Sequence, residues 1–263
     1  YEQMRRYKLA GQTLKRAVDL QPENNELRRE YANLLMQAED YEGSLAAYEE
    51  VVKGEARDAG SWLRISQLNM QLGRTEKAWE AHKKASELES GNIEIRYNAV
   101  GLYEAQDKLP EAISAMKEVL GDSSMRGGSA EAKKNRARLM ERLGLLYRNN
   151  GQYTEAAGAF REVGELDKDS GARAAAQIVE SWRQGKDYAK SIAAADEALK
   201  TYPGDRMIRL VRASSLVEAG RGKEAVEDIK GMLDGKSDRE THLQLAQLPQ
   251  RMKNYGEMGK SLD

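Results

Sequence analysis

The sequence contains no cysteine and only two histidines among its 263 residues. The absence of cysteine excludes disulfide bonds, thiolate catalysis and cysteine metal ligands, and it leaves the compartment open because oxidising and reducing compartments both tolerate it. His82 and His242 have no candidate nucleophile near them in the sequence, so an acyl-transfer site has no support. We expect no catalytic residues, no cofactor and no metal.

Long apolar runs and an excess of one charge are also missing. No stretch approaches the roughly 18 apolar residues of a membrane span, and the net charge is −1 with a pI near 6.3. No global field therefore attracts nucleic acid or an anionic membrane. We expect a soluble chain without membrane insertion, cytoplasmic or bacterial periplasmic. Because the chain starts at Tyr1 rather than Met, a removed leader or anchor fits the sequence.

The sequence does contain a repeat of about 34 residues, with units starting near residues 25, 59, 93, 137, 172, 206 and 239. Charged residues make up 32% of the chain, which suits a thin structure with much surface. One position of each unit holds a small residue that lets two helices approach closely: Ser44, Ala78, Ala112, Ala156, Ser191 and Ala225. Apolar residues lie four and seven positions further on, so they form one stripe of a helix.

A second stripe of the same kind precedes a short polar turn in each unit. The stretch around Met140, Leu143, Gly144 and Tyr147 shows the helical spacing, and "NNGQ" is the turn that follows it. The next helix opens with an acid or a proline in its first turn, as in "KLPEA". Each unit is therefore expected to be a helix, a turn and an antiparallel helix.

Residues 142–160, RLGLLYRNNGQYTEAAGAF, carry the most specific form of this pattern. Leu143, Gly144, Tyr147, Ala156 and Phe160 fit L-G-x2-Y…A-x3-F, so the sequence resembles the tetratricopeptide repeat family over nearly its whole length. The resemblance implies an all-α solenoid, a right-handed superhelix of antiparallel helix pairs. It also implies a noncatalytic scaffold or adaptor that binds a protein or peptide in its concave groove.

The repeat spacing predicts one solenoid over residues 1–263, cut from a longer array or a longer protein. Its expected parts are a partial repeat 1–24, repeats 25–58, 59–92 and 93–126, a loop insert at about 121–130, repeats 137–171, 172–205 and 206–238, and a partial repeat 239–263. Residues 130–136 are expected to lengthen the helix after the insert, and Pro249 to end or kink its helix near Leu248. Uncapped ends would favour self-association.

Other chemistry in the sequence has a structural explanation. The many carboxylate pairs belong to solvated helix faces, because nothing singles out two that converge across a cleft. "GRGKEA" lacks the G-x4-G-K-[ST] spacing of a phosphate loop, and Gly220 falls on a turn position of the repeat. His82 occupies a packing position.

The family resemblance places the partner-binding groove on the first helices of the units. The residues expected to line it are Arg29, Asn33, Met70, Tyr97, Arg138, Arg148, Asn149, Arg173, Arg183, Met207, Leu210 and Val217. Four arginines against Glu141 and Glu180 make the middle basic, and the last three residues are apolar where they would face water. We expect an acidic segment with apolar anchors; ordinary solvation and helix ion pairs are the alternative explanation of the arginines.

The sequence bears on four further functions. Arg29 and Asn33 suit the carboxylate clamp of chaperone-binding family members, but Glu94 would repel the carboxylate. RNA recognition needs a basic face in every repeat, and the first three units are acidic there, so no nucleic acid is expected. The chain could instead be the recruiting or regulatory arm of an enzyme whose catalytic domain lies elsewhere, or a structural part of a bacterial envelope or secretion assembly.

Overall fold

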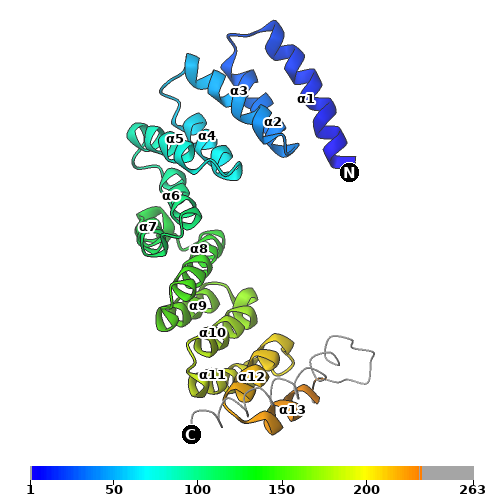
Figure 1. Ribbon diagram of the computed structural model, residues 1–263, viewed down its shortest axis with the longest axis vertical. Helices are drawn as coiled ribbons and strands as arrows, with labels where there is room; N and C mark the ends of the chain where they lie inside the picture. The colour runs from blue at the N-terminus through cyan, green and yellow to red at the C-terminus, as the bar shows by residue number, and fades with distance from the viewer. Residues whose placement is uncertain (1, 231, 233–263) are drawn as a thin grey trace. The chain divides into compact units, whose positions relative to one another are not determined.

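The protein is built from helices throughout the part that the structure describes. A computed structural model describes residues 2–230 and 232, and within them it contains thirteen α-helices, two short 3-10 helices and no strand. From α1 to α7 and again from α8 to α13, short turns join successive helices, which pack as antiparallel neighbours (Figure 1). The helices are α1 (Glu2–Leu20), α2 (Asn25–Gln37), α3 (Tyr41–Gly54), α4 (Ala59–Gln71), α5 (Thr75–Leu88), α6 (Ile93–Ala105), α7 (Leu109–Gly121), η1 (Ser123–Arg126), α8 (Ala130–Asn149), α9 (Tyr153–Leu166), η2 (Lys168–Ser170), α10 (Gly171–Gln184), α11 (Tyr188–Thr201), α12 (Arg206–Glu218) and α13 (Gly222–Lys230).

The first helix of most pairs starts at an Asp or Asn that caps it. Asn24, Asp58 and Asn92 accept hydrogen bonds from backbone N–H groups in the first turns of α2, α4 and α6, and Asp205 does so for α12. Each cap satisfies a donor that has no partner inside the helix. The repeat of these caps sets where each pair begins.

The turn between the two helices of a pair contains one residue in the left-handed backbone region. Three of these residues are glycines, and Glu39, Asp107 and Lys186 hold the same geometry with φ between 56° and 60°. The next N–H reaches back to a carbonyl of the preceding helix, as from Asp40 to Leu35 at 2.9 Å. This is the Schellman end of a helix, and it reverses the chain within a few residues. Gly220 is therefore a helix-ending residue, as expected.

The small residue of each helix pair lies where its two helices approach each other closely. Ser44, Ala78, Ala112, Ala156, Ser191 and Ala225 are all fully buried, so the predicted stripe is confirmed. Where this residue is serine its hydroxyl donates to a carbonyl of the partner helix, from Ser44 to Ala32 at 2.7 Å and from Ser191 to Val179 at 2.8 Å. Those bonds satisfy hydroxyls that would be costly to bury alone.

The chain divides into two compact units between Asp122 and Ser123. Unit 1 contains α1 to α7, and the described part of unit 2 contains α8 to α13. The predicted insert includes η1, and its tail lengthens α8, which starts at Ala130. A single array over residues 1–263 stays a prediction. His242, Pro249 and the partial repeat 239–263 lie outside the described residues.

Candidate functional site

In unit 2 the first helices of successive pairs are joined by side chains along one face. Arg173 on α10 pairs with Glu141 on α8, and Arg148 on α8 donates to Gln177 on α10 at 2.6 Å. Arg183 continues the series by donating to Glu218 on α12 at 2.6 Å. We call this surface the α8–α10–α12 face and define it by Arg138, Leu145, Arg148, Asn149, Arg173, Arg183, Met207 and Leu210.

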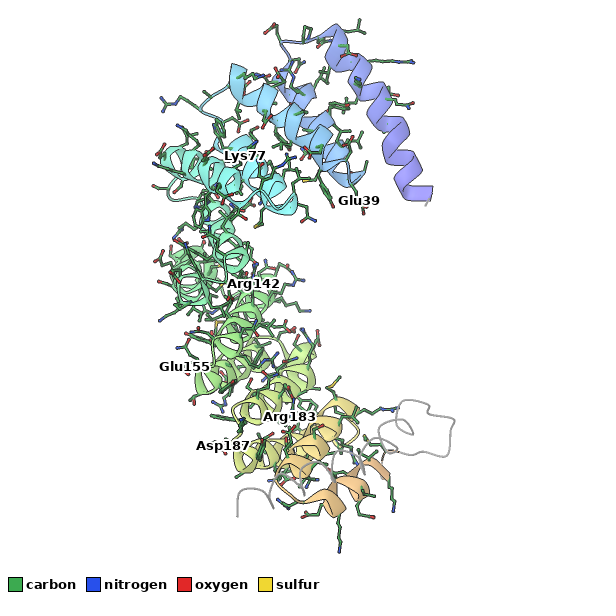
Figure 2. The ribbon with its side chains drawn as sticks, viewed as in Figure 1. Glu39, Lys77, Arg142, Glu155, Arg183 and Asp187 are labelled. Atoms are coloured by element: carbon green, nitrogen blue, oxygen red, sulfur yellow. The ribbon has the colours of Figure 1, made fainter. Side chains whose placement is uncertain are left out.

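Arg183, which is labelled in Figure 2, forms ion pairs with two glutamates, more than any other arginine of this face. Its Nε and Nη2 donate to the two carboxylate oxygens of Glu180, both at 2.8 Å, while Nη1 bonds Glu218. Burial alone would raise the pKa of Glu180, but hydrogen bonds from Arg183 and Gln184 outweigh it and lower that pKa. Arg183 therefore holds α10 and α12 together rather than offering a free charge.

Arg138 and Arg148 are the arginines of this face that lack a carboxylate partner. Within the described residues neither forms an ion pair: Arg138 is exposed and donates to Asn135 at 3.1 Å, and Arg148 bonds only an amide oxygen. Arg148 is half-buried, with its guanidinium 5.6 Å from the centre of the Phe160 ring. Burial lowers the pKa of Arg148, and its charge is therefore poorly solvated. A carboxylate partner would stabilise it.

A pocket of about 240 Å³ adjoins Arg138 at one end of the face. Arg138 and Lys134 from α8 line it together with Arg173 from α10, and Asp167 and Asp169 line it too. Lys134 pairs with Asp169 at 3.2 Å. The pocket therefore brings two predicted residues, Arg138 and Arg173, to one opening with mixed charge.

Apolar residues on the face differ from expectation in two places. Met207 is 59% exposed and Leu210 is half-buried, as a contact surface requires. Val217 departs from the expected set, because it is 3% exposed and packs with Ile192 and Leu216 in the core. The groove residues expected from the sequence do not include Leu145, although it is 37% exposed and lies on the same side of α8 as Arg138. An apolar residue at a groove position was the signal that would have found it.

The predicted residues of unit 1 are tied into its own structure. Arg29 pairs with Glu55 at 2.7 Å and with Asp58 at 3.0 Å, and the hydrogen bond that Arg29 donates to Glu55 is the main reason that the pKa of Arg29 is raised. Asn33 accepts from the Tyr48 hydroxyl at 2.6 Å. Met70 and Tyr97 are half-buried. Arg29 and Asn33 therefore hold neighbouring helices of unit 1 together.

Replacing Asp58 with alanine is expected to cost about 0.5–2 kcal/mol of stability through the lost helix cap. Asp58 accepts from the Ser61 backbone at 3.0 Å and from its hydroxyl at 2.7 Å, besides pairing with Arg29. Urea unfolding followed by Trp62 fluorescence, with Trp79 and Trp182 replaced by phenylalanine, measures the change, since Trp62 lies in the same helix. An Asp58→Asn variant keeps the cap and should recover most of the loss; equal losses in both variants would refute the capping role.

Within residues 2–230 and 232, no group of three or more His, Asp or Glu side chains is arranged to hold a metal ion. In the same residues no helix combines the length and the hydropathy needed to cross a membrane.

Repeated helix pairs with a small residue at each crossing define an α-solenoid protein, whose class binds along its stacked helices. The sequence matches the tetratricopeptide repeat family over residues 1–58, 31–92, 97–171 and 176–239, and the chain belongs to that family. Family members are in general protein-interaction scaffolds with protein or peptide partners. A comparison with curated proteins finds no match.

Several solved structures share the fold at low sequence identity. A tetratricopeptide repeat protein from Parabacteroides merdae has a TM-score of 0.60 at 18% identity, covering 89% of this chain and 87% of that one. PilF from Pseudomonas aeruginosa gives 0.57 at 17%, covering 90% and 97%. YrrB, titled a TPR protein with an unusual peptide-binding site, gives 0.55 at 18%, covering 74% and 94%. At these sequence identities the likenesses show the fold alone. What the neighbouring proteins bind or assemble with is a property of those proteins.

Proposed function

We propose that the chain is a noncatalytic adaptor whose α8–α10–α12 face binds an acidic protein segment with apolar anchors. One observation carries the proposal. On α8 the exposed Leu145 lies three residues from Arg148 and seven from Arg138, so all three share one side of the helix. Neither arginine has a carboxylate partner among the described residues. An apolar residue between two such cations suits a segment that alternates acids and apolar residues.

The α8–α10–α12 face carries an excess of positive charge, which supports an acidic partner. The excess is smaller than the sequence indicated. Four arginines face three glutamates, because Glu218 of α12 joins Glu141 and Glu180. The pairs formed by Arg173 and Arg183 fix the spacing of α8, α10 and α12. Arg138 and Arg148 then supply the charge-assisted hydrogen bonds to a partner, and these are among the stronger polar contacts in proteins.

Apolar contacts add to these polar ones at both ends of the face. Met207 and Leu145 are the two large apolar side chains of unit 2 that are exposed among its described residues. Burying each against a partner stabilises a complex by roughly 1.5–3 kcal/mol at most. The partner therefore needs apolar residues near its acids, and a purely acidic segment is expected to bind more weakly.

A charge reversal at Arg138 tests the proposed function. The probe is a synthetic peptide of glutamate, leucine and serine residues, with a lysine-for-glutamate version as its counterpart, measured by isothermal titration calorimetry on the full chain. We expect Arg138→Glu to weaken binding of the acidic peptide at least about tenfold, because it removes a charge-assisted hydrogen bond and adds repulsion. Leu145→Ala should weaken the same binding by a few-fold without changing its salt dependence.

Arg161→Glu is the matched control. Arg161 is an exposed arginine of the same unit that lies on α9, outside the α8–α10–α12 face. The control makes the same change in net charge, so it should leave binding nearly unchanged. Equal weakening by Arg138→Glu and Arg161→Glu, or a preference for the lysine peptide, would overturn the proposal.

A further inference from the structure

We propose a second binding site in unit 1, a pocket that takes a lysine or arginine side chain of a protein partner. The pocket has a volume of about 300 Å³ and is enclosed by α5, α6 and α7. It involves no residue of the α8–α10–α12 face, so it does not depend on the function proposed for that face.

The pocket opens on the side of α6 opposite the predicted groove. Arg96, Ala99 and Tyr103 line it at spacings of three and four residues, which places them on one stripe of the helix. At 100° per residue, this stripe lies well over a third of a turn from that of Glu94 and Tyr97. A partner held here would therefore contact a surface separate from the face expected to form the groove.

Small side chains create the space in this pocket. Ser86 from α5, Ala99 from α6, and Ser114 and Ala115 from α7 line it between the larger groups. The volume is at the lower end of the range for ligand sites, which begins at about 300 Å³. It suits one long side chain better than a nucleotide or another large cofactor.

An aromatic cluster borders the inner part of the pocket. His82 and Tyr103 line it, and Trp79 contacts both rings edge to face, with centroids 5.3 Å and 4.9 Å away. His82 is 9% exposed, and burial lowers its pKa, so its ring is neutral at physiological pH. Aromatic rings accept both the methylene stem of lysine or arginine and its cationic head.

The rim of the pocket carries uncompensated negative charge. Glu111 and Glu118 lie seven residues apart on α7 and both line the pocket. Neither has an ion-pair partner within the described part of the chain, whereas Arg96, the cation of the pocket, is already paired with Asp122. Two free carboxylates beside an aromatic wall favour a cationic guest over an acidic one.

Trp79 allows binding at this pocket to be measured directly. The chain has three tryptophans, so Trp62→Phe with Trp182→Phe leaves Trp79 as the reporter. The full chain in this background is titrated with a peptide of lysine, alanine and glycine and, separately, with its glutamate counterpart. We expect saturable binding and a change in Trp79 emission with the lysine peptide, and neither with the glutamate peptide.

Two variants assign that binding to the pocket. Glu111→Gln with Glu118→Gln removes the negative charge at the rim and should weaken binding of the lysine peptide at least about tenfold. Ala115→Phe fills the space without changing charge and should weaken it as well. The control is Glu76→Gln with Glu80→Gln. These two exposed acids lie on the side of α5 away from the pocket. Their replacement makes the same change in charge and should have little effect on binding. Circular dichroism checks that each variant is folded.

The proposal is overturned if the lysine peptide leaves Trp79 emission unchanged, or if the Glu111/Glu118 and Glu76/Glu80 variants weaken binding equally. Binding that survives Ala115→Phe in a folded protein would also contradict it. Failure of the acidic peptide at the Arg138 face would leave these results unaffected, because the two probes carry opposite charges and the sites lie in different units.

Discussion

Replacing Phe160 with alanine is expected to lower the free energy of unfolding of unit 2 by about 3–5 kcal/mol. Phe160 is the only phenylalanine of the chain and is fully buried on α9. Its ring fills the space above Gly144 and lies beneath the guanidinium of Arg148, so alanine would leave a cavity in the middle of the α8–α9 pair. Urea unfolding followed by Trp182 fluorescence, with Trp62 and Trp79 replaced by phenylalanine, reports on unit 2 alone.

Gly144 provides a second test of the same contact. A Cβ at this position would lie 2.9 Å from two carbon atoms of the Phe160 ring, so Gly144→Ala should cost about 1–3 kcal/mol by overpacking. In the Phe160→Ala background the added methyl has room, and alanine should then stabilise the helix by up to about 1 kcal/mol relative to glycine. The sign of the effect is expected to reverse.

Gly158→Ala is the control for helix propensity. Gly158 lies in α9 with no atom within 4 Å of an added Cβ, so this substitution should stabilise the protein in both backgrounds. If Gly144→Ala had the same effect with and without Phe160, the close approach of α8 and α9 at these residues would be refuted.

Replacing Arg183 with methionine should cost about 2–3 kcal/mol at neutral pH. Removing one member of a buried ion pair costs about 3–5 kcal/mol, and the remaining exposure of this network reduces the expected loss. The side chains of Glu180 and Glu218 are 21% and 15% exposed, and both would lose their guanidinium partner. Lys200→Met, which removes a pair between two exposed side chains, is the control and should change stability little.

The cost of Arg183→Met should depend on pH in a defined direction. Arg183 helps to hold the folded-state pKa of Glu180 below its usual value, so this glutamate stabilises the fold above its unfolded pKa, about 4.3. That stability is lost as the pH falls through the lower folded pKa. The difference between wild type and Arg183→Met should therefore shrink below about pH 4 as Glu180 becomes neutral. A difference independent of pH would show that packing, not charge, is responsible.

The sequence predicted the helix pairs well because their packing rules are local and repeated. The small residue at each crossing recurs from Ser44 to Ala225, and helical spacing alone places it opposite the partner helix. The sequence predicts a turn around Glu39 ("AEDY") as well as at Gly220. The left-handed backbone of Glu39 and Lys186 could not be predicted, because the neighbouring helices impose a geometry that these residues rarely adopt.

The candidate site was predicted less completely because exposure and pairing depend on neighbouring helices. Arg183 was predicted to contact an acidic partner, with ion pairs as the alternative, and in the structure Glu218, 35 residues away, pairs with it. Val217 shares the repeat register of surface residues but turns into the core of unit 2. Leu145 occupies the register of Arg138 and was overlooked, since leucine in a helix is more often buried. Repeat position alone therefore assigns a helix face, and the packing decides what remains open on it.

A titration of the full chain with the acidic glutamate–leucine peptide, followed by backbone amide chemical shifts, tests the central claim most directly. The account predicts that the largest shifts fall on α8, α10 and α12, around Arg138, Leu145 and Arg148, and that they disappear in Arg138→Glu. Shifts concentrated on α9 and α11, or spread over unit 1, would contradict it.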